Sequence, residues 1–108
     1  MYNYQQIYEL MKKFYELDGI QVRIIEHLMK EGYVKAKYSE LTEDLGFDKA
    51  KMSSNVRKSL IRLHELGIVY IVYKDTKISH PMEACYLVDN WMENLLNADS
   101  NEISKLKE

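Results

Sequence analysis

The stretch SELTEDLGFDKAKMSSNVRKSLIRLHELGIVYIVY, residues 39–73, decides how this chain folds. A short helix is expected over residues 39–45, followed by a turn at Gly46. A longer helix is expected over about residues 49–66, because Asp48 is a favoured N-cap residue and Gly67 suits the conformation that ends helices. The apolar run of residues 68–73 then predicts a strand. The expected order is therefore helix, turn, longer helix and strand.

The longer helix has an apolar side and a basic side. On a helical wheel of roughly 100° per residue, five residues gather on the side expected to pack inward. They are Met52, Val56, Ser59, Leu60 and Leu63. The opposite side carries Lys51, Ser54, Lys58, Arg62 and Glu65, with Asn55 and Arg57 on its flanks. The pattern predicts a helix that packs by one side and offers hydrogen-bond donors on the other.

Charge is unevenly distributed in this chain, whose formal net charge is −2. Residues 48–62 hold five Lys or Arg residues and one Asp, which gives +4. Residues 81–108 hold six acids and two lysines, which gives −4. Positive charge is thus concentrated on the longer helix, as expected of a surface that meets phosphates.

Two helices are expected before this stretch and one after it. The first, over residues 3–17, has an apolar stripe of Ile7, Leu10, Met11, Phe14 and Leu17, flanked by Tyr4, Tyr8 and Tyr15. The second begins after Asp18, which can form a capping box with Gln21, and ends at Gly32. Residues 33–38 are a weak strand candidate, and Ser39 is the expected cap of the short helix. Residues 84–88 are expected to return as the second strand of a hairpin, and Asp89 or Asn90 to cap the last helix.

Length and composition further limit the number of domains and the compartment expected for this protein. A chain of 108 residues, 46% hydrophobic and 30% charged, is expected to form a single globular domain. Residues 68–73 form its longest apolar run, too short to span a bilayer, and no signal segment is recognised at its beginning, so we expect a cytoplasmic protein. One cysteine, Cys85, excludes an intrachain disulfide.

The order of elements is typical of a winged helix-turn-helix, an α+β, mainly helical fold. The expected divisions are an N-terminal helix (1–18), the winged core (19–89) and a C-terminal helix with a frayed tail (90–108). Residues 20–88 resemble the winged helix-turn-helix regulators of prokaryotes, MarR-like and ArsR-like in the broad sense. The matching residues are Leu41, Leu45, Val56, Arg57, Leu60, Leu63, Glu65, Gly67, Ile68 and Val69. The connection from Gly46 to Val56 departs from that pattern by about four extra residues, or roughly one helical turn.

A weaker resemblance is to the winged helix of the large subunit of general transcription factor IIE and its archaeal relatives. The matching residues are Val56, Arg57, Lys58, Leu60, Leu63, Glu65 and Asp75. Those proteins carry a zinc ribbon after the winged helix, whereas this chain has only Cys85. The resemblance therefore extends to the winged part alone.

These features predict sequence-specific binding of double-stranded DNA by a homodimeric transcription regulator. The helix at about 49–66 would enter the major groove, and the wing at 74–83 would contact the backbone or the adjacent groove. Asn pairs with adenine, while Lys and Arg contact guanine or phosphate. The candidate DNA-binding residues are Lys49, Lys51, Ser54, Asn55, Arg57, Lys58, Arg62, Lys74 and Lys77. The candidate dimer interface is Ile7, Leu10, Met11, Phe14, Trp91 and Leu95.

Other classes of function find less support in the sequence. No catalytic triad, P-loop or glycine-rich phosphate motif is present, so neither an enzyme nor a cofactor is predicted. The spacing of His27, His64, His80 and Cys85 matches no metal-ligand pattern. A small-molecule effector is compatible with the sequence, but no feature indicates one. The alternative is a winged-helix module that binds proteins of the transcription or replication machinery, favoured by the outward position expected for Ile61 and by the acidic C-terminal end.

Overall fold

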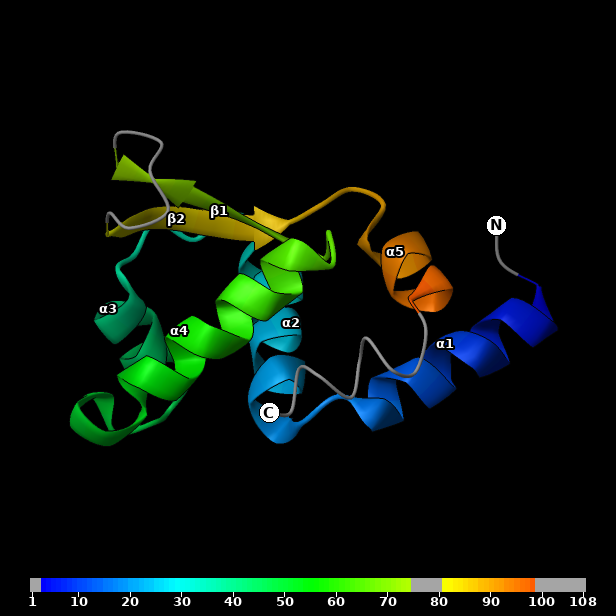
Figure 1. Ribbon diagram of the computed structural model, residues 1–108, viewed down its shortest axis with the longest axis horizontal. Helices are drawn as coiled ribbons and strands as arrows, with labels where there is room; N and C mark the ends of the chain where they lie inside the picture. The colour runs from blue at the N-terminus through cyan, green and yellow to red at the C-terminus, as the bar shows by residue number, and fades with distance from the viewer. Residues whose placement is uncertain (1–2, 75–80, 99–108) are drawn as a thin grey trace.

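The computed structural model describes residues 3–74 and 81–98, which form five helices and a two-stranded antiparallel sheet (Figure 1). The helices are α1 (Tyr4–Glu16), α2 (Gly19–Glu31), α3 (Tyr38–Asp44), α4 (Lys49–Glu65) and α5 (Trp91–Asn97), and the strands are β1 (Val69–Tyr73) and β2 (Met82–Leu87). The chain thus has a mainly helical α+β fold.

Side-chain caps fix where the helices begin. The Asp18 carboxylate accepts a hydrogen bond from the Gln21 N–H, and the Gln21 side chain accepts one from the Asp18 N–H, which confirms the predicted capping box. Asp48 caps α4 as predicted, because its carboxylate accepts from the N–H groups of Ala50 and Lys51 at 2.9 and 3.2 Å. The long helix therefore begins just three residues after Gly46, at Lys49.

Two local predictions between α2 and α4 are wrong. Ser39 lies inside α3, whose N-cap is Lys37, because the Glu40 carboxylate accepts from the Lys37 N–H at 2.9 Å and so starts the helix earlier. Residues 33–38 form no regular strand. Only Val34 pairs, with Cys85 of β2, through two reciprocal backbone hydrogen bonds of 2.9 Å, since the chain turns into α3 a few residues later.

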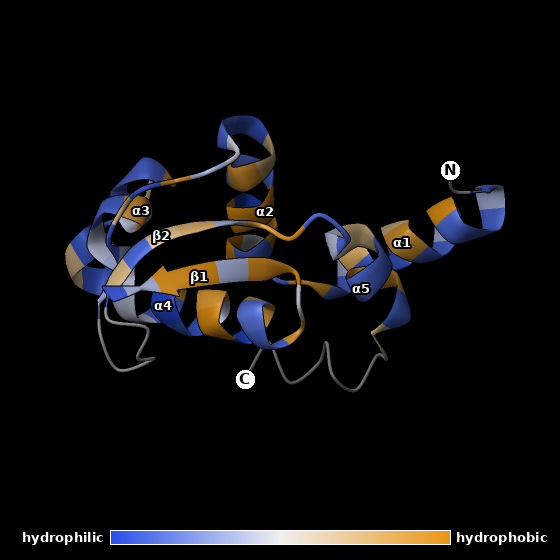
Figure 2. Cartoon of the chain, turned by 90° about the horizontal axis from the view of Figure 1, so that it is seen from above, coloured by the Kyte–Doolittle hydropathy of each residue, from blue (hydrophilic) through white to orange (hydrophobic). Residues whose placement is uncertain are grey.

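The sheet covers one side of the helical core. β1 and β2 pair from Val69↔Leu87 to Val72↔Ala84, and an irregularity follows between Val72 and Tyr73. The second strand begins at Met82, earlier than predicted. Seen from above in Figure 2, β1 and β2 lie over α4 and α2. The fully buried side chains beneath the sheet include Ile24, Ile25 and Leu28 of α2 and Val56, Leu60 and Leu63 of α4.

A glycine just after the end of α4 is hydrogen-bonded to the last helix, α5. Gly67 has a positive φ of 76°, and the N–H of Ile68 donates to the carbonyl of Leu63 in the pattern that closes helix ends. The Asn94 side chain of α5 donates to the Gly67 carbonyl at 2.7 Å. A Cβ at position 67 would lie 2.9 Å from the Asn94 Nδ2 atom, so the contact requires glycine.

The outer helices pack on each other, and this corrects part of the predicted dimer interface. Trp91 and Leu95 of α5 are buried inside the chain, and the Trp91 ring meets Phe14 of α1 edge-on at 5.9 Å. The Lys13 ammonium also donates to the Ala98 carbonyl. Leu10 and Phe14 are partly buried against the core, because α5 folds back over this side of α1. Of the six predicted interface residues, only Ile7 and Met11 are exposed.

Candidate nucleic-acid interface

The solvent side of α4 presents a row of polar and cationic side chains. Those exposed to solvent are Lys49, Lys51, Ser54, Asn55, Arg57 and Lys58. Lys51, Ser54 and Lys58 face away from the buried stripe of Val56, Ser59, Leu60 and Leu63, and Asn55 and Arg57 lie on its flanks. Lys49, in the first turn, lies on the same side of the helix as Val56 and beside Glu43 of α3. Five of the predicted DNA-binding residues therefore lie together on one accessible surface of a helix whose opposite side anchors it to the core.

Two of these cations have neighbours within the chain. The Lys49 ammonium lies 3.2 Å from the Glu43 carboxylate of α3, with both side chains more than half exposed. Such an exposed ion pair contributes little and is easily exchanged for a phosphate. The Arg57 guanidinium lies 5.8 Å from the centre of the Tyr38 ring, which holds it over α3.

Tyr38 ties the three elements of this surface together. Its ring lies under Arg57 of α4, and its hydroxyl is buried beside that of Tyr73 at the end of β1. Burial, followed by the neighbouring Tyr73 hydroxyl, raises the pKa of Tyr38 well above its ordinary value. The phenol therefore stays neutral at physiological pH and acts in packing, so that α3, α4 and the hairpin hold a fixed mutual position.

The C-terminal half of α4 is less exposed on its predicted DNA-binding side than the sequence indicated. Ile61 is partly buried and packs against the core, so it is not the outward residue that the helical wheel placed between Lys58 and Arg62. Ile61 lies about 160° from Leu63 on an isolated helix, and the wheel was misleading because contacts with the rest of the fold partly bury it. Arg62 is also only partly exposed.

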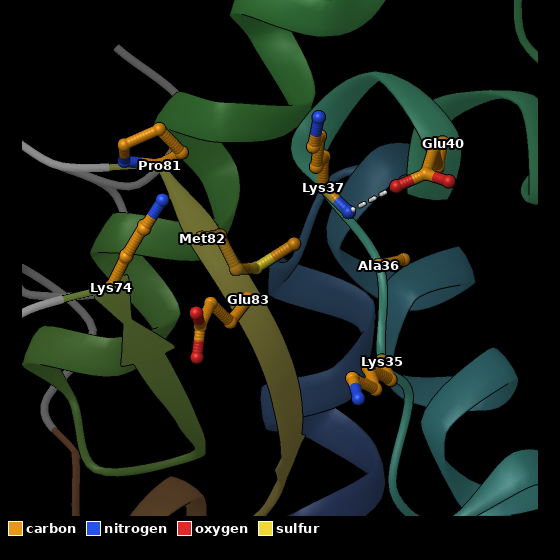
Figure 3. Close-up of a pocket in the computed structure, with 8 residues that line it drawn as sticks. All are labelled: Lys35, Ala36, Lys37, Glu40, Lys74, Pro81, Met82 and Glu83. Atoms are coloured by element: carbon orange, nitrogen blue, oxygen red, sulfur yellow. Dashed lines mark hydrogen bonds between the residues drawn. The ribbon is translucent and has the colours of Figure 1, made fainter.

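A second group of lysines lies between α3 and the hairpin. Lys35, Lys37 and Lys74 line a pocket of about 540 Å³, together with Glu40, Glu83, Ala36, Pro81 and Met82. Figure 3 shows Lys74 and Glu83 on the hairpin side, with Lys35 and Lys37 on the other. Lys74 was predicted as a wing contact, but Lys35 and Lys37 were not among the predicted DNA-binding residues. The sequence feature that indicates them is the alternation of two lysines with Val34 and Ala36, which are buried, because alternation in an extended segment sets both lysines on one side.

The two basic groups share one end of the molecule. In Figures 1 and 2, α3, the beginning of α4 and the far end of the hairpin lie together, opposite α1 and α5. The predicted contact Lys77 lies outside the described residues. Lys74, which precedes residues 75–80, is exposed, and its backbone N–H donates to the Pro81 carbonyl at 3.1 Å. Cations before α3 and at the end of β1 thus lie at the same end of the molecule as the beginning of α4.

Tyrosines form a row across the outer face of the sheet. The Tyr33, Tyr86 and Tyr70 rings stack in succession, with centres 5.7 and 5.4 Å apart, because Tyr70 and Tyr86 are directly paired and Tyr33 precedes the bridge at Val34. The His64 ring meets Tyr70 edge-on at 5.4 Å. Tyr33 and Tyr70 remain exposed at the two ends of this row, while Tyr86 between them is partly buried.

The histidines and the cysteine show no metal-site geometry among residues 3–74 and 81–98. No group of three or more His, Cys, Asp or Glu side chains there could hold an ion. The His64 Nδ1 atom is occupied at the edge of β1, 3.1 Å from the Val69 carbonyl oxygen and 3.3 Å from the Ile71 nitrogen. Burial raises the pKa of the Cys85 thiol to about 12, which keeps it protonated. His80 lies outside the described ranges.

Comparisons with protein-family models, with curated proteins and with solved structures found no match for this chain. Among the described helices, none is long and apolar enough to cross a membrane.

Proposed function

We propose that this chain is a winged helix-turn-helix protein that binds double-stranded DNA as a homodimeric transcription regulator. The order of elements supports this. Helices α2, α3 and α4 are followed at once by the β1–β2 hairpin, and Val34 adds a short third pairing to the sheet, as in winged helices. In this proposal α4 is the recognition helix and the hairpin end is the wing.

One observation carries the proposal: the exposed side of α4 is free of large apolar residues and rich in donors, while its other side is fully anchored. An α-helix fits the major groove, which is about 12 Å wide. Lys51, Ser54 and Asn55, in the first half of α4, would contact base edges. Arg57 and Lys58 would contact guanine or phosphate, and the lysines beside the hairpin would bind the flanking backbone.

Salt-dependent binding tests this assignment. Fluorescence anisotropy with a labelled random-sequence duplex should give an affinity that falls steeply between about 50 and 200 mM salt. If Arg57 and Lys58 each neutralise one phosphate, replacing both by Ala should reduce the slope of log K against log salt by about 1.8. Lys30→Ala, which removes an exposed lysine of α2 that is not among the proposed contacts, is the matched control and should leave the slope unchanged. Equal slopes for wild type and the double variant would exclude α4 as the contact.

The second candidate function is a module that binds proteins of the transcription or replication machinery. Ile61 no longer supports it, since that side chain is partly buried in the chain itself. The tyrosine row supports it instead, because Tyr33 and Tyr70 are exposed and tyrosine is enriched at protein interfaces. A wild-type protein with no salt-sensitive affinity for any duplex would favour this candidate over the first.

A further inference from the structure

The side of α1 that faces away from α5 carries an exposed stripe of large apolar side chains. The stripe consists of Tyr4, Ile7, Tyr8, Met11 and Tyr15, whose exposed fractions range from 43% at Ile7 to 93% at Tyr4. None of the thirteen residues of α1 is fully buried. The helix is thus apolar on two sides, one packed against α5 and one open to a partner.

The spacing of this stripe is that of a helix-pairing seam. Tyr4, Tyr8, Met11 and Tyr15 follow one another at intervals of four, three and four residues, the alternation that keeps a seam facing a second helix. This seam differs from the stripe of Leu10 and Phe14, which is used inside the chain. A helix pair along the seam therefore leaves the packing between α1 and α5 unchanged.

We propose that the occupant of this stripe is α1 of a second copy of the chain, in antiparallel orientation. Two-fold symmetry then places Tyr8 opposite the partner's Met11, and Tyr4 opposite the partner's Tyr15. Thioether sulfur and aromatic rings make favourable contacts, and tyrosine covers apolar area while its hydroxyl stays in water. The inference rests on the homodimeric form of the proposed function and names the surface that forms it.

The helix dipoles favour the antiparallel orientation. An antiparallel pair sets the positive N-terminal end of each α1 beside the negative C-terminal end of the partner's α1, whereas a parallel pair aligns like ends. Lys12 lies beside the seam, with its ammonium 5.7 Å from the centre of the Tyr8 ring, so its charge stays at the solvent edge of the pair.

The available area suits a dimer of moderate affinity. Each large aromatic side chain buries about 150–250 Å² when it is covered. The three tyrosines of each copy, six in the pair, would therefore approach the ~1,200 Å² at which specific interfaces begin. Ile7 and Met11 add further apolar area at the centre of the pair.

Sedimentation of the full chain without DNA tests this interface. The wild type should be a dimer that dissociates on dilution. Tyr8→Ser should weaken dimerisation at least tenfold, because each dimer loses two central rings. Tyr70→Ser, which removes a comparably exposed tyrosine from β1 (47% against 60% for Tyr8), is the matched control and should leave the dissociation constant unchanged. Circular dichroism verifies that both variants remain folded.

Disulfide trapping tests the orientation. Under mild oxidation an equimolar mixture of Tyr4→Cys and Tyr15→Cys should form a cross-linked dimer, because the antiparallel pair sets these positions opposite each other. Tyr4→Cys alone should not, and ready cross-linking of Tyr4→Cys to itself would overturn the antiparallel orientation. A wild type that is monomeric at ~100 μM, a concentration at which a dimer of micromolar dissociation constant is largely formed, would overturn the proposal. Equal effects of Tyr8→Ser and Tyr70→Ser would also overturn it. Because no DNA is present, failure here leaves the DNA-binding test unaffected.

Discussion

Replacing Gly67 by alanine should lower the free energy of unfolding by roughly 2–3 kcal/mol, from two separable causes. The first is conformational, because a residue with a Cβ at the positive φ of 76° costs about 1–2 kcal/mol. The second is a collision, since the new Cβ would lie 2.9 Å from the Asn94 Nδ2 atom. Asn94 must then move away from the Gly67 carbonyl, with loss of a hydrogen bond that contributes about 1 kcal/mol.

Gly46→Ala provides the matched control for this change. Gly46 also follows a helix end with a positive φ, 87°, and the Phe47 N–H donates to the Thr42 carbonyl just as Ile68 donates to Leu63 after α4. A Cβ at position 46 meets the Arg23 guanidinium only at an ordinary 3.6 Å. Gly46→Ala should therefore lower the free energy of unfolding only by the conformational cost of about 1–2 kcal/mol.

Urea unfolding followed by circular dichroism, at a fixed protein concentration, measures both variants. Gly67→Ala should cost about 1 kcal/mol more than Gly46→Ala, and this excess should disappear in an Asn94→Ala background. Equal costs for the two glycine variants in the wild-type background would refute the packing of Asn94 against the end of α4.

Three further changes test other parts of the structure. Leu60→Ala should lower the free energy of unfolding by about 2–5 kcal/mol in urea titrations because Leu60 is fully buried, whereas Lys58→Ala two residues away should change it by less than about 0.5 kcal/mol. Because burial raises the pKa of the Cys85 thiol from 9.0 to about 12, the unfolded chain releases this proton first, so stability should fall as pH rises from about 9 towards 12, and less steeply in Cys85→Ala. An identical alkaline slope in both proteins would contradict the burial of this thiol. Replacing Lys35 and Lys37 by Ala should weaken duplex binding in anisotropy measurements without changing the unfolding midpoint, and unchanged binding would remove the pocket from the interface.

The features that were predictable from sequence are those fixed by neighbouring residues. The capping residues Asp18, Gln21 and Asp48 and the glycines Gly32 and Gly67 all act within a few positions, so their patterns identified the ends of α2 and α4. The buried stripe of α4 followed from its period, because its packing side is set by the spacing of Val56, Leu60 and Leu63.

Features that depend on distant contacts were not predictable in this way. The stripe of α1 cannot show by itself that α5 folds back onto Phe14 and leaves the tyrosine side open. Similarly, Ile61 has an outward position on an isolated helix and becomes partly buried only in the complete fold. Lys35 and Lys37 reach the hairpin because Val34 pairs with Cys85, about fifty residues further along the chain.

The role of α4 as the DNA-binding helix can be tested directly by mapping the DNA contact on the isotope-labelled protein by NMR. During titration with a short random-sequence duplex, we expect chemical-shift changes in the backbone amides of the first half of α4, around Lys51, Asn55 and Lys58. Smaller changes are expected at residues 35–37 and Lys74. Changes confined to the tyrosine row around Tyr70 and Tyr86, or no changes at low salt, would contradict the assignment of α4 as the DNA-binding helix.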